Sequence, residues 1–219
     1  MKPAIQMPSR RPDLIVRYSH AARLAHWAVA VSYVVLFLSG LALFHPFFFW
    51  ISALFGGAPF VRIVHPFLGV TFAVLFYVWA GRLWRDNLLL PSDRRWLSRM
   101  FLYINRIGQD VPVEGKYNAG QKVMYWSMVV IIAVLLCTGI LMWRPYFSPA
   151  FSPQVKRAAG VIHAVAAFIM FVGIGIHIYA AYWVKGSIRA MTRGTVSRAW
   201  ARFHHPGWYE KVERSETRG

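Results

Sequence analysis

Long apolar runs alternate with polar, basic segments along the whole chain. Four runs hold about 20 apolar residues each, the length that crosses the hydrocarbon core of a bilayer as an α-helix. Apart from tyrosines and Cys137, their only ionisable side chains are histidines. The pattern predicts an all-α fold, an integral membrane four-helix bundle that forms a single domain over residues 1–219. The predicted spans cover approximately residues 24–44, 63–81, 123–143 and 158–184.

Polar segments connect these spans and flank them. A basic arm precedes the first run, a loop at residues 82–117 joins the second to the third, and residues 186–219 form a basic tail. A surface helix is expected within the loop, around residues 96–107. An aromatic stretch that follows His45 is expected to lie in the membrane interface. Tryptophans mark the ends of the runs, as in the aromatic belts of membrane helices: Trp27, Trp50, Trp79, Trp126, Trp143 and Trp183.

The 25 lysines and arginines are distributed asymmetrically about the spans. Five precede the first run, eight lie around the middle loop and eight follow the last run. Arg62, Arg144, Lys156 and Arg157 are left for the opposite side. Because Lys and Arg are enriched in cytoplasmic loops, both termini and the loop at 82–117 are predicted to be cytoplasmic.

This segregation changes the meaning of the net charge of +17. A soluble domain this basic would be a candidate for nucleic-acid binding. Here the basic residues flank membrane spans, so we expect membrane lipid and no nucleic acid as a partner. The eight Asp and Glu residues all lie in the segments predicted to be cytoplasmic. Transporters usually need intramembrane carboxylates or broken helices, so transport is disfavoured.

Four histidines inside the spans carry the candidate chemistry. His26 begins the first span, His65 begins the second, and His163 and His177 both lie in the fourth. Ionisable residues within a membrane span usually have a functional role. Taken singly, each imidazole is explained equally well as a neutral packing group bonded to a backbone carbonyl.

Depth and direction sort these histidines into pairs. His163 and His177 are 14 residues apart, which corresponds to about 21 Å along a helix and about 40° around it. They therefore face one side of the fourth span at opposite membrane depths. The predicted topology puts His65 level with His163 near the outer surface. It puts His26 level with His177 near the inner surface.

Bis-histidine pairs between helices are a common means of holding low-spin haem in a bundle. The sequence therefore predicts two non-covalent haem b groups. His65 and His163 would bind the outer haem, and His26 and His177 the inner one. Small residues near the ligands would let a porphyrin approach the backbone, although glycine is also common at ordinary helix contacts in membranes. The glycines concerned are Gly69, Gly160 and Gly173.

His45 is a second candidate for the outer ligand, since it also lies near the outer surface. Its position in a His-Pro step beyond the first span favours a solvent-facing role instead. His20, His204 and His205 lie in the cytoplasmic segments and are expected on the surface. Haem propionates need cations near the interfaces. Basic residues on both sides could fill this role, or they could instead anchor the spans in the membrane. They are Arg62, Arg144 and Arg157 outside, and Arg23 and Lys185 inside.

The order of these motifs resembles that of the gamma subunit of respiratory formate dehydrogenase. The resemblance covers nearly the whole chain. It is carried by RYSHAARLAHW at 17–27, RIVHPFLG at 62–69, KYNAGQK at 116–122, WRPYF at 143–147, HIYAAYWVKGSI at 177–188 and FHHPGWY at 203–209. A histidine pair alone would also fit other cytochrome families, including the cytochrome b subunits of membrane hydrogenases. The KYNAGQK and WVKGS stretches are typical of formate dehydrogenase more narrowly.

The resemblance implies the same four haem ligands and adds a quinone pocket beside the inner haem. Asn118, Gly120 and Gln121 would line that pocket. From the residues alone, Asn118 followed by Gln121 is also a capping box that opens the third span, and both roles can coexist.

The resemblance also implies partners and a location. A beta subunit with iron–sulfur clusters and an alpha subunit with a molybdenum or tungsten pterin would sit on the outer face of a bacterial inner membrane. The chain would have both termini inside. Its expected function is to anchor the complex and to carry electrons from the iron–sulfur subunit through two haems to quinone. The alternatives are the cytochrome b of a hydrogenase or other oxidoreductase, and a haem-free membrane anchor or transporter.

Overall fold

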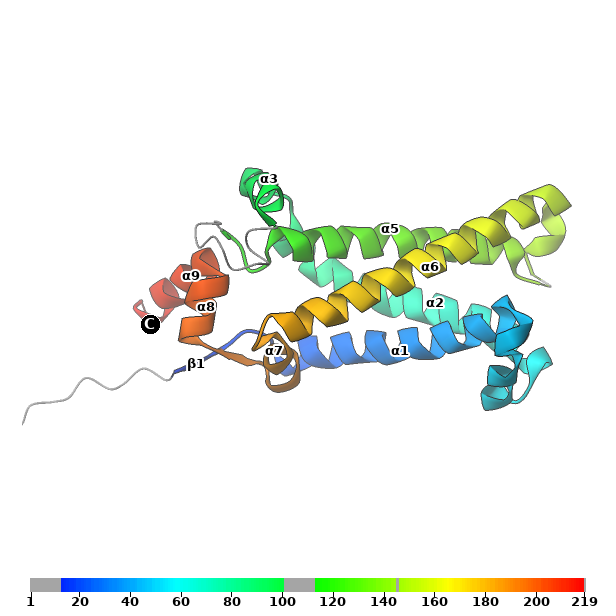
Figure 1. Ribbon diagram of the computed structural model, residues 1–219, viewed down its shortest axis with the longest axis horizontal. Coiled ribbons are helices and arrows are strands. Elements are labelled where there is room, and N and C mark those ends of the chain that lie inside the picture. Colours follow the sequence, from blue (N-terminus) through cyan, green and yellow to red (C-terminus); the bar gives the residue numbers. More distant parts are fainter. Residues whose placement is uncertain (1–12, 101–112, 145, 219) are drawn as a thin grey trace, which may run out of the picture.

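Four long helices form the body of the protein (Figure 1). The computed structural model describes residues 13–100, 113–144 and 146–218. The four helices contain the four predicted spans almost completely, and each begins four or five residues earlier than predicted. They are α1 (His20–Phe44), α2 (Ala58–Leu83), α5 (Ala119–Met142) and α6 (Pro153–Trp183).

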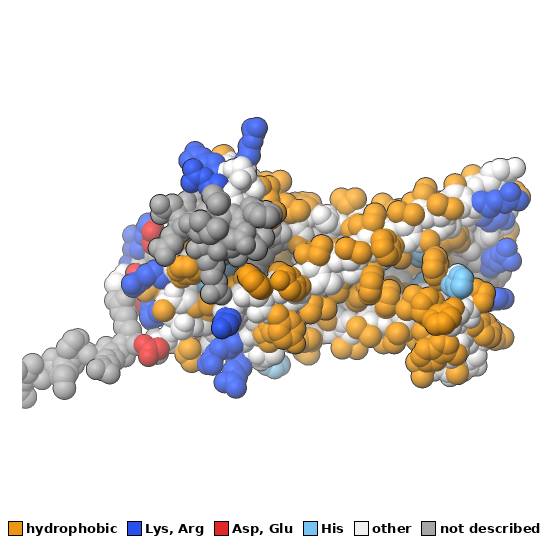
Figure 2. All heavy atoms as spheres, in the orientation of Figure 1, with side chains coloured by type: hydrophobic (Ala, Val, Ile, Leu, Met, Phe, Trp, Pro, Cys, Tyr) orange, Lys and Arg blue, Asp and Glu red, His pale blue; other side chains and the backbone are white. Residues whose placement is uncertain are grey.

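The outward-facing side chains of these helices are mostly apolar, as expected for a bundle exposed to lipid. Each is long and apolar enough to cross a membrane. Large hydrophobic residues such as Val31, Val74, Val130 and Phe168 are more than half exposed. Figure 2 shows hydrophobic side chains along the length of the bundle and Lys and Arg toward its two ends. The prediction of an all-α integral membrane bundle is confirmed.

The interior is a narrow apolar seam. Helices α1 and α2 pack against each other, as do α5 and α6, while α2 and α5 join the two pairs. A cluster of buried side chains from α2, α5 and α6 occupies the middle of the seam: Phe72, Ala73, Phe76, Ala80, Met128, Ile132 and Met170. The rest of each helix surface is exposed. The contacts in this seam therefore determine which faces of the spans pack together.

The two ends of the bundle differ. At one end, the chain leaves α1 into the 3-10 helix η1 (Pro46–Phe55), which is the aromatic stretch expected at the interface. The short 3-10 helix η3 (Ser148–Ala150) connects α5 to α6 at the same end. We call this the η1 end, and it corresponds to the predicted outer side.

At the other end, the segment before α1 pairs with the tail. Strand β1 (Leu14–Val16) runs antiparallel to β2 (Thr195–Ser197), with Ile15 opposite Val196. Both of these residues are buried in a small cluster with Ala190, Ala201 and Tyr209. Such short strands are stable only when packing supports them. We call this the sheet end, and it corresponds to the predicted cytoplasmic side.

The tail folds into three further helices around this sheet. They are α7 (Ser187–Arg193), α8 (Arg198–His204) and α9 (Pro206–Glu216). Gly194 has a φ of 81°, and a Cβ there would lie 2.7 Å from the carbonyl oxygen of Tyr18. A Cβ on Gly207 would lie 2.5 Å from the carbonyl oxygen of Glu114. Glycine is therefore required where the tail touches the arm and the loop.

The loop between α2 and α5 also has structure at the sheet end. It begins with the 3-10 helix η2 (Arg85–Asn87), and α3 (Pro91–Ser98) follows. The surface helix expected around residues 96–107 overlaps α3 only at its start, since α3 begins at Pro91, which suits the first turn of a helix, and ends at Ser98. Residues 101–107 of that prediction lie outside the described residues.

His205 corrects a prediction, since it is buried rather than on the surface. It is 2% exposed, and Arg17 beside it is 4% exposed. Arg17 Nη2 donates to the carbonyl oxygen of Lys116 at 2.7 Å and to His205 Nε2 at 3.1 Å. The guanidinium also lies over the rings of Trp200 and Trp208, at 5.1 and 4.8 Å from their centroids. Arm, loop and tail therefore meet around one buried cation.

The other two histidines of these segments lie nearer the surface. His20 is exposed, as predicted, and His204 is half-buried. The prediction failed for His205 because its burial depends on contact with Arg17, which is distant in sequence.

The burial of His205 predicts that the stability of the folded tail depends on pH. Burial, followed by the charges of Arg17 and His204, lowers the pKa of His205 from 6.5 to about 2. The folded state therefore keeps this ring neutral while an unfolded tail would protonate it. The contribution of the neutral ring to the stability of the folded tail is fully present above pH 6.5. It falls below that pH, by about 1.4 kcal/mol per pH unit for one titrating site.

We expect hydrogen exchange in 195–209 to become faster at pH 5 than at pH 8, after correction for the intrinsic exchange rate. His205→Gln keeps an oxygen that can accept from Arg17 and cannot titrate, so its protection should depend much less on pH. Equal loss of protection in wild type and His205→Gln would show that other groups control this transition.

Candidate functional site

The four candidate ligands meet as two pairs, both of which include a residue of α6. At the sheet end, the ring centroids of His26 and His177 are 6.3 Å apart, with the ring planes at 46°. At the η1 end, those of His65 and His163 are 6.4 Å apart, with the planes at 69°. The depth matching predicted from helix periodicity thus agrees with the positions of all four side chains.

These separations fit a metal held between two imidazoles. A histidine nitrogen binds such a metal at about 2 Å, and the nitrogen lies about 1 Å from its ring centre. Two trans imidazoles therefore need ring centres about 6 Å apart. Direct contact between the rings, or an N–H···N hydrogen bond of about 3 Å between them, would bring the ring centres closer, to about 5 Å. The residues present at both sites fit the haem that the sequence predicts.

The η1-end pair has additional polar partners that the sequence analysis did not identify. Ser39 Oγ lies 2.8 Å from His65 Nδ1, and Thr138 Oγ1 lies 2.9 Å from His163 Nδ1. Each hydroxyl precedes a glycine near the η1 end of its span, within LSGLA and CTGIL. The repetition of a hydroxyl–glycine dipeptide in the first and third spans was the available signal.

Apolar side chains fill the level between the two pairs. Phe37 of α1 stacks on Phe171 of α6 with the centroids 5.0 Å apart and the planes at 3°. Tyr33 lies beside Phe37 and Phe72, at 5.9 and 6.3 Å. With the buried seam of α2 and α5, these rings place aromatic and apolar side chains in the space that separates the sites.

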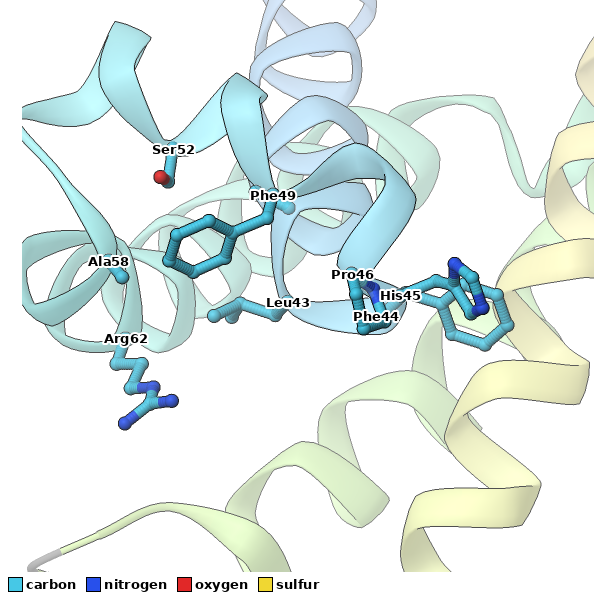
Figure 3. A pocket seen from close by; sticks show the side chains of 9 residues that line it. Leu43, Phe44, His45, Pro46, Phe49, Ser52, Ala58 and Arg62 are labelled. Carbon is cyan, nitrogen blue, oxygen red and sulfur yellow. The ribbon is translucent and has the colours of Figure 1, made fainter.

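His45, the second candidate for the outer ligand, caps η1. Its Nδ1 accepts the backbone N–H of Phe47 at 3.2 Å, and its ring is exposed. It lines a pocket of about 300 Å³ at the η1 end together with Arg62 and Phe49 (Figure 3). This arrangement supports the solvent-facing interpretation of His45.

The candidate partners of haem propionates lie at the two ends. Arg62, Arg144 and Arg157 are exposed at the η1 end. At the sheet end, Arg23 Nη1 donates to the carbonyl oxygen of Thr192, so the tail already binds this side chain. No single cation is thereby selected for either site.

Asn118 and Gln121 form the capping box that the sequence predicted. Asn118 Oδ1 accepts the N–H of Gln121 at 2.9 Å, and Gln121 Oε1 accepts the N–H of Asn118 at 3.1 Å. Both side-chain oxygens are thereby used at the start of α5. Among the described residues, none accepts a hydrogen bond from either side-chain NH₂ group. Two amide donors thus remain for a ligand.

The third candidate of this group, Gly120, lies against an aromatic side chain. A Cβ on Gly120 would be 3.2 Å from the ring of Trp96. Trp96 belongs to α3, and Asp93 on the same helix accepts a 2.7 Å hydrogen bond from Lys122 Nζ. Lys122 is 1% exposed. Burying such a pair costs desolvation free energy, and removing one partner would leave the other charge buried and unpaired. The pair therefore holds α3 against the start of α5.

Comparisons with known proteins agree with these features. Residues 17–194 match the model of the family described as prokaryotic cytochrome b561. The chain belongs to this family. It is 40% identical over 206 residues to the cytochrome b556(fdo) subunit of formate dehydrogenase of Escherichia coli K12, covering 94% of this chain and 97% of the relative.

Two further relatives show the same extent of similarity. The cytochrome b556(Fdn) subunit of the nitrate-inducible formate dehydrogenase of Escherichia coli K12 is 41% identical over 208 residues, with 95% and 96% covered. The cytochrome b556 subunit of formate dehydrogenase of Haemophilus influenzae is 39% identical over 197 residues, with 90% and 83% covered. The resemblance drawn from the sequence motifs is confirmed at the level of the family.

The geometry at the η1 end leads to a test of the two candidate ligands. His65→Ala removes one imidazole of the pair with His163, so the protein should lose one of the two haems that the sequence predicts. His45→Ala removes only a capping interaction and should leave both bound. The haem-to-protein ratio of detergent-purified protein, from the pyridine haemochrome assay, measures this. A halved ratio in His45→Ala would instead identify His45 as the ligand.

Proposed function

We propose that this cytochrome b is the membrane subunit of a formate dehydrogenase complex. It would accept electrons from an iron–sulfur subunit and pass them through two b haems to quinone at the cytoplasmic side. The main observation behind the proposal is the two histidine pairs at different depths, with ring centroids 6.3 and 6.4 Å apart. The names of the relatives supply formate as the substrate of the complex.

In this proposal each histidine pair holds one haem. His65 and His163 bind the outer haem, while His26 and His177 bind the inner one. A bound haem supplies an iron couple that takes up and releases one electron. Since α6 contributes a ligand to both sites, this helix sets the depth difference between them, about 21 Å from the 14-residue spacing.

The apolar level between the sites would keep protons from following the electrons. Stacked rings such as Phe37 and Phe171 occupy it, and the predicted spans contain no Asp or Glu. Formate oxidation at the outer face would release protons there, while quinone reduction would take protons from the cytoplasm. A potential across the membrane would then arise without a proton channel in this chain.

The quinone would bind at the sheet end, at the start of α5. The capping box orients the amide groups of Asn118 and Gln121, leaving their N–H donors for a quinone carbonyl oxygen. The backbone at Gly120 lies against the ring of Trp96, which would border the same pocket. The cap and the binding role therefore use different atoms of the same side chains.

The charge distribution supports the orientation in this proposal, and the resemblance to the formate dehydrogenase gamma subunit supports the partners. The sheet end, with most of the basic residues, would face the cytoplasm of a bacterium, and both termini would lie inside. The η1 end would face outward and contact the iron–sulfur beta subunit. An alpha subunit with a molybdenum or tungsten pterin would complete the complex.

The first alternative, a hydrogenase cytochrome b, would share the histidine pairs but receive its electrons from another enzyme. The second, a haem-free anchor or transporter, leaves the ring separations without a cause. Purification from native membranes separates the three. We expect two haems per chain and reduction of both by formate under anaerobic conditions. Reduction by hydrogen alone would favour the first alternative, and absence of haem the second.

A second prediction separates the quinone role of Asn118 from its capping role. Asn118→Ser keeps an oxygen that caps the helix but removes the amide donor. Haem content, assembly and reduction by the dehydrogenase should be unchanged. Reoxidation of the inner haem by added quinone should slow about two- to twelvefold, as expected for one hydrogen bond of about 0.5–1.5 kcal/mol.

Stopped-flow absorbance after mixing reduced protein with quinone measures this rate. Gln121→Ala is the companion variant, because it removes the other amide of the capping box. If Asn118→Ser reoxidises like wild type while Asn118→Ala impairs assembly, Asn118 is a cap and the quinone assignment fails.

A further inference from the structure

The hydroxyls beside the η1-end pair occupy equivalent positions in two helix pairs. Ser39 on α1 contacts His65 on the neighbouring α2, and Thr138 on α5 contacts His163 on the neighbouring α6. Ser39 is 0% exposed and Thr138 is 7% exposed. A buried hydroxyl within the hydrocarbon region is retained at a cost unless it is hydrogen-bonded, and both of these are.

The direction of these hydrogen bonds follows from the number of protons available. A hydroxyl has one proton to donate. Ser39 Oγ donates it to the carbonyl oxygen of Leu36 at 2.8 Å, and Thr138 Oγ1 donates to that of Val134 at 2.6 Å. Each hydroxyl then accepts from the Nδ1–H of its histidine. The lone pair of Nε2 is thereby left for a metal.

The glycine after each hydroxyl allows this contact. A Cβ on Gly40 would lie 3.3 Å from His65 Cε1, and a Cβ on Gly139 would lie 3.5 Å from His163 Cε1. The imidazoles therefore lie directly against the backbone of α1 and α5. Ser39-Gly40 and Thr138-Gly139 act as matching supports for the two rings.

At the sheet end, His26 lacks this support. His26 Nδ1 is buried and has no hydrogen-bond partner among the described residues. Its ring is surrounded by the edges of Trp27 and Trp79, at 5.3 and 5.8 Å. The two sites thus have the same ligand type but different surroundings at Nδ1.

We infer that Ser39 and Thr138 are positioning residues that fix the tautomer of His65 and His163 and lower the midpoint potential of the η1-end haem. The inference rests on the proposed haem sites. A hydrogen bond from Nδ1–H makes the imidazole a stronger electron donor, and this stabilises the oxidised iron. Electrons that enter at the η1 end are then biased toward the sheet end, where this effect is missing at His26.

The test is a potentiometric titration of the purified complex, followed by optical and electron paramagnetic resonance spectra. Ser39→Ala and Thr138→Val remove the hydroxyls, and each should shift one midpoint potential upward. The affected haem should be the one lost in His65→Ala, and the other potential should stay in place. Thr138→Ser and Ser39→Thr keep a hydroxyl and should remain near the wild-type values. Thr71→Val, at an exposed position on α2, is the matched control.

Each outcome decides the inference. Unchanged or lowered potentials in Ser39→Ala and Thr138→Val, with both haems bound, would overturn it. So would an equal upward shift in Thr138→Ser, since the hydroxyl would then not be the cause. Loss of the η1-end haem in Thr138→Val but not in Thr138→Ser would support the positioning role. Failure of the proposed function appears separately, as a wild-type chain with fewer than two haems.

Discussion

An imidazole inside a lipid-exposed bundle needs a partner for its ring nitrogens, and this requirement organises the four spans. Burying a polar group without a hydrogen bond or metal is costly. The structure faces His65 toward His163 and His26 toward His177, so a metal between the rings of each pair would satisfy one nitrogen of each ring. Because α6 carries one member of each pair, α1 and α2 must both pack within reach of it.

The same requirement explains why the two ends of the bundle are built differently. At the η1 end, the neighbouring helices supply Ser39 and Thr138 from within the membrane. At the sheet end, segments outside the spans form the polar contacts. There the tail binds Arg23 through a backbone carbonyl, and a buried ion pair holds α3 to α5. Hydroxyls of the spans thus contact the histidines at the η1 end, whereas the tail and α3 make the polar contacts described at the sheet end.

Much of the architecture could be predicted because it depends on local periodicity. Apolar runs of membrane length located the four helices, and the 14-residue spacing of His163 and His177 predicted which histidines share a depth. The capping box at Asn118 was also visible, since its residues are three positions apart. These signals require no knowledge of which helices are neighbours.

The parts that escaped prediction depend on contacts between distant segments. Strands β1 and β2 have three residues each, too few for a recognisable alternation, and each is stable only against the other. His205 appeared to be a surface residue because its burial needs Arg17, near the opposite end of the chain. Ser39 and Thr138 looked like ordinary small residues until the packing of α1 on α2 and of α5 on α6 brought them to the rings.

The pairing of β1 with β2 has a consequence for biosynthesis. Arg17 leaves the ribosome before any span is made, whereas Trp200 and His205 follow only after the fourth span. Until those residues are made, this arginine lacks its partners and the layer over the sheet end cannot close. All four spans are therefore synthesised before this end can close, and translation of the last helices allows closure. Any group that must enter from this side has its widest access during that interval.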